Sequence, residues 1–189
     1  MAKVALIITQ GFADWEYALI AGTGGYFYGL DVQFFSPEVG EVQSQGGLIA
    51  LVSKDLDDLV QWEADAVVVV GGLIWEADHA PDITQLLKGE RLRGAVVAGI
   101  CGGTLALARA GLLDDVRHTS NGPGFLGQHV SGYAGVTQYV ASPSAISEDR
   151  VITAPGSAPV SFTAALFEEV GLGQEAVASL KTMMGAEHS

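Results

Sequence analysis

The sequence of 189 residues has one cysteine, few charged residues and no long apolar run. A single cysteine cannot form a disulfide within the chain, which excludes disulfide-stapled scaffolds and favours a reducing compartment. No stretch approaches the roughly 20 apolar residues of a membrane-spanning helix. Polar and acidic residues follow the short apolar run at the N-terminus at once, unlike in a signal peptide. We therefore expect a soluble, cytoplasmic protein that does not engage a membrane.

Basic residues are also scarce. Nine lysines and arginines stand against 22 aspartates and glutamates, for a net charge of -13. This negative charge repels the phosphate backbones of nucleic acids, so we expect no nucleic-acid partner. An acidic surface commonly serves solubility, so the charge alone does not indicate any other partner. Hydrophobic residues make up 49% of the chain, which indicates a buried core and not disorder. The length fits one domain over residues 1–189.

Short apolar runs alternate along the chain with segments of helical spacing. Residues 4–9 and 66–70 are continuous apolar runs, typical of central parallel strands covered on both faces. The alternation predicts an α/β fold, with a mostly parallel sheet between two layers of helices. The predicted strands are 4–9, 31–36, 66–70, 95–98, 117–121, 137–140 and 150–153, with a hairpin over 42–52; the predicted helices are 14–30, 82–91, 104–113, 157–170 and 174–183, with a turn or short helix over 122–129.

Cys101 stands in Gly99-Ile100-Cys101-Gly102-Gly103, after the predicted strand 95–98. G-x-C-x-G is the thiol form of a nucleophile elbow, a sharp strand-to-helix turn that leaves one reactive side chain exposed. Glycines suit its flanks because side chains there would collide with the neighbouring strand and helix. The N-terminus of the following helix favours a thiolate, so we predict a lowered pKa for Cys101. The alternative is a small, inert buried residue, the commonest fate of a free cysteine.

Further motifs accompany the elbow in order. Gly11-Phe12-Ala13-Asp14-Trp15-Glu16 precedes it, and His118-Thr119-Ser120-Asn121 follows the elbow helix. Together with residues 98–113, these motifs resemble the ThiJ/PfpI superfamily, over most of the chain from Lys3 to about Val170. That group includes the parkinsonism-associated deglycase and intracellular protease/amidase-like proteins, and is related to class I glutamine amidotransferases. The resemblance implies a flavodoxin-like three-layer sandwich and a homodimer.

The resemblance also implies roles for three residues besides the cysteine. A glutamate from the start of the first helix, here Glu16, would hydrogen-bond Cys101, and burial beside the sulfur would keep its carboxyl protonated. The backbone N–H groups of Gly72 and Gly102 would form an oxyanion hole. Alternatively, Glu16 is an ordinary glutamate of the first helical turn, which the helix dipole favours. The alternative for Gly72 is a tight turn at Gly71-Gly72 that needs glycine for its backbone dihedral angles.

The sequence departs from the family pattern in its histidines. Many members carry a histidine beside the cysteine or about twenty residues beyond it, where this chain has Gly102 and Asn121. His118 is nearby, but in a strand it would face away from the side of Asn121. His118 and Asn121 are candidate pocket residues, as is His79 in the segment after the strand 66–70.

Trp15 and Trp75 flank the predicted cleft from two loops, so we expect them to line it, although aromatic residues near helix starts are more often core. The four histidines and the single cysteine have no metal-ligand spacing. No glycine-rich stretch has the context of a nucleotide site. We expect neither a metal nor a cofactor.

These residues favour a cofactor-independent enzyme in which Cys101 attacks a small electrophilic substrate. By resemblance the substrate is a carbonyl compound, a glycated adduct, an amide or an isonitrile. The missing histidine weakens amide cleavage most, because a leaving amine needs a proton donor. Two alternatives stay open: a redox-responsive stress or chaperone-like protein whose Cys101 is oxidised to a sulfinic acid, and a non-catalytic domain that binds a small metabolite.

Overall fold

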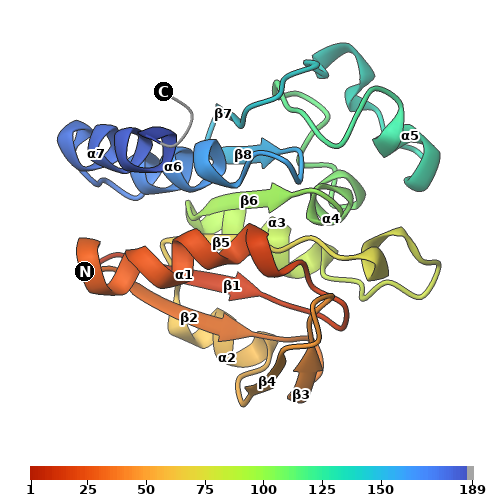
Figure 1. Cartoon of the computed structure of the whole chain (residues 1–189). Helices are drawn as coiled ribbons and strands as arrows, with labels where there is room; N and C mark the ends of the chain where they lie inside the picture. Colours follow the sequence, from red (N-terminus) through yellow and green to blue (C-terminus); the bar gives the residue numbers. More distant parts are fainter. Residues whose placement is uncertain (187–189) are drawn as a thin grey trace.

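A six-stranded sheet runs through the centre of the computed structural model, which describes residues 1–186 (Figure 1). The strand order is β2-β1-β5-β6-β8-β7. The first five strands of that order are parallel, and β7 pairs with β8 antiparallel at one edge. The bounds are β1 Lys3–Ile7, β2 Asp31–Phe35, β5 Ala66–Val69, β6 Val96–Ile100, β7 Ile146–Glu148 and β8 Val151–Ala154.

Helices cover both faces of this sheet (Figure 1). Alternate residues of β1 pack to opposite sides, because successive side chains of a strand point to opposite faces. Val4 and Leu6 join the core beneath α1, α6 and α7, and Ala5 and Ile7 join the core beneath α2, α3 and α4. The bounds are α1 Asp14–Tyr28, α2 Leu56–Trp62, α3 Thr84–Arg93, α4 Gly103–Arg109, α6 Pro159–Glu169 and α7 Gln174–Gly185. The predicted three-layer α/β sandwich is confirmed.

Shorter elements lie outside the central sheet. The hairpin expected over 42–52 is present as β3 (Gly40–Gln43) and β4 (Ile49–Val52), which pair antiparallel. Three short helical segments lie within the loops at the carboxyl ends of the strands: η1 (Leu73–Glu76), α5 (Phe125–His129) and η2 (Gly135–Gln138). Within residues 1–186, every helix is too short or too polar to cross a membrane.

Two predicted strands, 117–121 and 137–140, are wrong. A single bridge joins His118 to Tyr139, and η2 occupies the start of the second segment. The backbone N–H of Thr119 donates to the side-chain hydroxyl of Thr153 (2.9 Å) and not to a strand carbonyl, so this stretch adds no ladder to the sheet. The sequence reading also missed β7 and α2, although α2 begins with a reciprocal capping box between Asp55 and Asp58.

Candidate active site

Cys101 lies at the turn between β6 and α4, at the carboxyl edge of the parallel strands. Its φ is +55°, in the left-handed region that costs a non-glycine residue about 1 kcal/mol or more. Hydrogen bonds hold the turn in this conformation: Cys101 N donates to Ala154 O (2.9 Å), and the Thr104 hydroxyl donates to Cys101 O (2.6 Å). The predicted elbow is therefore present, and it fixes the direction of the thiol.

The glycines around Cys101 allow neighbouring backbones to touch. A Cβ on Gly99 would lie 3.0 Å from the carbonyl oxygen of Gly103, and a Cβ on Gly102 would lie 2.7 Å from the carbonyl oxygen of Gly72. The same Cβ would lie 3.4 Å from Gly72 N, so the backbones of Gly72 and Gly102 are adjacent at the site. This arrangement brings together the two glycines predicted for an oxyanion hole.

Glu16, from the first turn of α1, lies beside Cys101 and is 0% exposed. Its Oε2 accepts a hydrogen bond from Gly71 N (2.7 Å). Its Oε1 is buried and has no hydrogen-bond partner among the described residues. A Cβ on Gly156 would lie 3.1 Å from this oxygen and 2.9 Å from Cys101 Sγ. The Glu16 oxygen and the Cys101 sulfur therefore both lie next to Gly156.

The two groups influence each other's ionisation. Burial raises the pKa of Glu16 to about 7. Burial first, and then the charge of Glu16, raise the pKa of Cys101 to about 11, against the weaker effects of hydrogen bonds from Asn121 and from the Gly102 backbone. The expected lowering of the thiol pKa by the helix N-terminus is thus wrong, because desolvation outweighs it. Between about pH 7 and pH 11 the pair holds one proton and one negative charge.

Asn121 is the third side chain at the sulfur. Its Nδ2 donates to Cys101 Sγ (3.2 Å), and its Oδ1 accepts from Gly156 N (3.0 Å). Trp15, 49% exposed, donates from Nε1 to Gly156 O (2.8 Å) at the rim of the site. Gly156 was missed from the sequence, although it follows β8 at the carboxyl edge, where ligands of parallel sheets bind.

Three other predicted pocket residues lie elsewhere. Trp75 is fully buried in the core, and its Nε1 donates to Val70 O (2.9 Å). His118 is also fully buried; its ring nitrogens pair with Val116 O (2.7 Å) and with the Tyr133 hydroxyl, and burial lowers its pKa.

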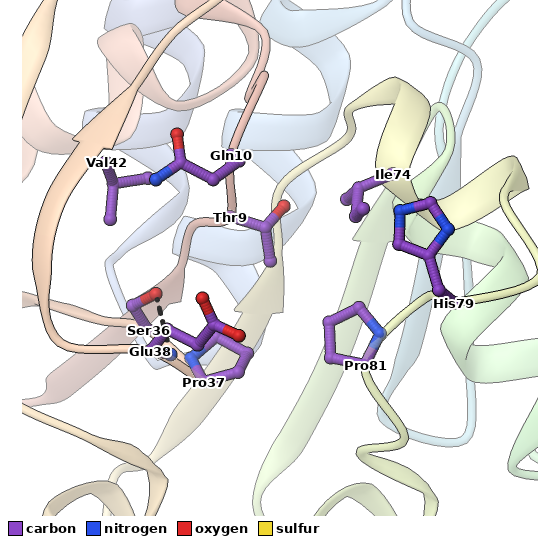
Figure 2. Close-up of a pocket in the computed structure, with 9 residues that line it drawn as sticks. All are labelled: Thr9, Gln10, Ser36, Pro37, Glu38, Val42, Ile74, His79 and Pro81. Atoms are coloured by element: carbon purple, nitrogen blue, oxygen red, sulfur yellow. Dashed lines mark hydrogen bonds between the residues drawn. The ribbon is translucent and has the colours of Figure 1, made fainter.

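His79 is exposed and lines a separate cavity (Figure 2). The structure thus brings Glu16, Asn121 and Trp15 to Cys101, and places no histidine in contact with the sulfur among the described residues.

Comparisons with known proteins agree on one family. The family model described as DJ-1/PfpI family matches residues 2–169. A protein of Bacillus subtilis (strain 168) named uncharacterized protease YoaZ is 32% identical over 177 residues, which cover 89% of this chain and 83% of that protein.

Solved structures agree in fold as well. The DJ-1 superfamily protein Atu0886 from Agrobacterium tumefaciens has a TM-score of 0.93 at 38% identity, with 100% of both chains covered. A thiJ/pfpI family protein from Bacillus anthracis has a TM-score of 0.85 at 26% identity, over 98% of this chain and 91% of that one.

Proposed function

Because the chain belongs to the DJ-1/PfpI family, we propose that it is a cofactor-independent enzyme in which Cys101 adds to the carbonyl carbon of a small substrate. One observation carries the proposal: a cysteine held at φ +55° on an elbow, with a fully buried carboxyl beside its sulfur. Strain of this kind is retained at functional sites, where the surrounding structure maintains it.

The chemistry follows from the shared proton. As the S–C bond forms, the thiol proton passes to Glu16, and the electron pair of the C=O bond moves to oxygen. The N–H groups of Gly72 and Gly102 receive the developing oxyanion. Glu16 then returns its proton to that oxygen, which leaves a neutral hemithioacetal. With an α-oxoaldehyde, a proton shift from the S-bound carbon to the neighbouring carbonyl group turns this adduct into a thioester. Water then cleaves the C–S bond, which releases a 2-hydroxy acid and the free thiol. Asn121 orients the sulfur throughout through its Nδ2 contact.

The absence of a histidine at the sulfur favours carbonyl addition over amide cleavage. The histidine closest in sequence to Asn121, His118, is held by Val116 and Tyr133. Protonation of a leaving amine would therefore depend on Glu16, which is buried and bonded to Gly71. Aldehydes, α-oxoaldehydes and glycated adducts need no such leaving group in the addition step.

Consumption of methylglyoxal tests this function. We expect turnover by the wild type and a loss of about 100-fold or more in Cys101→Ser and in Glu16→Gln, since each removes a group that acts in the addition step. Leu92→Ser, at a side chain 90% exposed on α3, is the control and retains the wild-type rate. Equal rates in Cys101→Ser and wild type, or no turnover of methylglyoxal and glycated amines by the wild type, would show that the proposal is wrong.

Oxidation sensing is the second candidate, because the same groups would hold an oxidised sulfur. A sulfinate on Cys101 would accept hydrogen bonds from Asn121 Nδ2 and from a protonated Glu16. Two equivalents of peroxide supply its two oxygen atoms and are reduced to water. Titration with peroxide and intact mass measurement would then show a selective gain of two oxygens in the wild type, and continued oxidation in Glu16→Gln.

A further inference from the structure

A second cavity, of about 360 Å³, is shown in Figure 2. It opens at the carboxyl edge of the parallel strands, where Cys101 also lies. One wall follows β1 and β2, and the other belongs to the loop after β5, which holds Ile74, His79 and Pro81. In the strand order, the chain passes from β1 outward to β2 and then returns to the other side of β1 as β5. Ligands of open α/β sheets bind in the crevice at such a reversal of strand order.

This cavity is separate from the site at Cys101. The intervening residue Phe12 is fully buried and bridges to Ser44 on one side and to Gly72 on the other. Ala13 N also donates to Gly71 O (3.0 Å), which fixes the chain between the two spaces. None of the residues that line the cavity contacts the sulfur of Cys101.

Thr9 provides evidence that the cavity is built for a ligand. The residue is 4% exposed, and its Oγ1 has no hydrogen-bond partner within residues 1–186. Figure 2 shows this oxygen pointing into the space between the two walls. The neighbouring Gln10 is satisfied, since it donates to Glu41 O (2.8 Å) and accepts from Gln43 N (3.0 Å). An unpaired buried hydroxyl costs about 1–3 kcal/mol, which a polar ligand atom would recover after a small rotation of the Thr9 side chain into the cavity.

The remaining lining residues indicate the chemistry of the ligand. Among the described residues that line the cavity, Glu38 is the acidic one and none is a lysine or arginine; the protein carries a net charge of -13. Pro37 and Pro81 approach from opposite walls, and Ile74 adds apolar surface (Figure 2). A volume near 360 Å³ is at the small end of ligand sites.

We propose that this cavity binds a small ring compound that carries a protonated amine. The amine lies at Glu38, the ring lies between the two prolines, and a hydroxyl or carbonyl group of the ligand bonds Thr9. The site is independent of the chemistry proposed for Cys101, because it shares no residue with it.

Tyramine is the probe, because it combines a flat ring, a hydroxyl and a protonated amine. Titration of ¹⁵N-labelled protein should give saturable shifts at the amides of Thr9, Ile74 and His79. The anion 4-hydroxyphenylacetate has the same ring and hydroxyl but a carboxylate in place of the amine. It should bind at least about 10-fold more weakly, because its charge repels Glu38.

Two variants assign the contacts. Thr9→Val keeps the shape of the side chain and removes its hydroxyl, and Glu38→Gln removes the charge; each should weaken tyramine binding about 3-fold to 10-fold. Glu41→Gln makes the same charge change on β3, outside the cavity, and should leave the affinity within about 2-fold. Glu38 is exposed, so its variant tests the proposal even where Thr9→Val does not fold.

Several outcomes would overturn the proposal. One is the absence of saturable shifts at the three amides. Others are equal binding of tyramine and 4-hydroxyphenylacetate, or unchanged affinity in both Glu38→Gln and a folded Thr9→Val. Alkylation of Cys101 should leave the tyramine affinity unchanged; a loss would place the amine at Cys101 instead and also overturn the second site.

Discussion

Glu16→Gln should speed the reaction of Cys101 with iodoacetamide at neutral pH. In the wild type the pKa of Glu16 is about 7, so at pH 7.5 about three-quarters of the molecules carry its negative charge. That charge, together with burial, raises the pKa of Cys101 to about 11, so only about 0.03% of the thiol is ionised at this pH. In the variant the charge is gone, and burial alone keeps the thiol pKa above the ordinary value of 9.0. At most about 3% is then thiolate at pH 7.5, so the alkylation rate rises by up to about 100-fold.

The rate is measured by intact mass between pH 5.5 and pH 10. The wild-type rate should still be rising at pH 10, and the rate of Glu16→Gln should level off at a lower pH, above pH 9. Glu41→Gln, which changes an exposed carboxylate, is the control and should retain the wild-type profile. Identical profiles for Glu16→Gln and wild type, or slower alkylation in the variant, would refute the argument that the charge of Glu16 holds the thiol protonated.

The same substitution should also change how stability depends on pH. The pKa of Glu16 is raised on folding from 4.5 to about 7, so the folded state holds the proton more tightly than the unfolded state. The resulting stabilisation is complete below pH 4.5 and is lost as the pH rises through 7; it amounts to about 3 kcal/mol. Urea unfolding should show a loss of about 2 kcal/mol between pH 5 and pH 7.5 in the wild type but not in Glu16→Gln. Parallel losses in the two proteins would contradict the raised pKa.

Three further substitutions test the surroundings of the sulfur. Asn121→Asp replaces the N–H donor at Sγ by a carboxylate, so alkylation at pH 7.5 should slow about 10-fold in the mass assay. Gly156→Ala would place a methyl group 2.9 Å from Sγ; it should abolish methylglyoxal turnover and cost about 1–3 kcal/mol in urea unfolding. Gly89→Ala, where nothing lies within 4 Å, should do neither. Cys101→Gly should be about 1 kcal/mol more stable than Cys101→Ala, since glycine accepts φ +55°; equal stabilities would mean that the elbow is unstrained.

Periodicity predicted the central strands because they are buried on both faces. The apolar run 66–70 contains β5, and the run 95–98 leads into β6. The failed strand 117–121 is buried at its centre, but the buried residues His118, Thr119 and Ser120 are polar, so it lacks the apolar run that marks the true central strands. Its Thr119 N–H bonds a side-chain hydroxyl of β8, a partner that depends on the folded arrangement and not on local sequence.

The site was predictable where a residue's chemistry and position coincide. Cys101 has both, since its thiol follows a strand and its glycine neighbours are required by contacts with the backbones of Gly103 and Gly72. Gly156 has no reactive group to mark it, although it contacts Asn121 and Trp15. Trp75 was wrongly assigned to the pocket because an indole suits both a core and a cleft. The hydrogen bond from its Nε1 to Val70 O places it in the core, and that bond is known only from the folded structure.

The position of Glu16 restricts the reactions that Cys101 can support. Asn121 donates a hydrogen bond but carries no titrating proton, so Glu16 is the proton carrier that faces the sulfur among the described residues. Its Oε2 accepts a hydrogen bond from Gly71 N, so the carboxyl proton is carried by Oε1, the oxygen that lies near the sulfur at Gly156. A leaving group on the solvent side of the carbon would lie away from this buried carboxyl. Reactions that keep all substrate atoms through the addition step therefore suit the site better than cleavage of an amide.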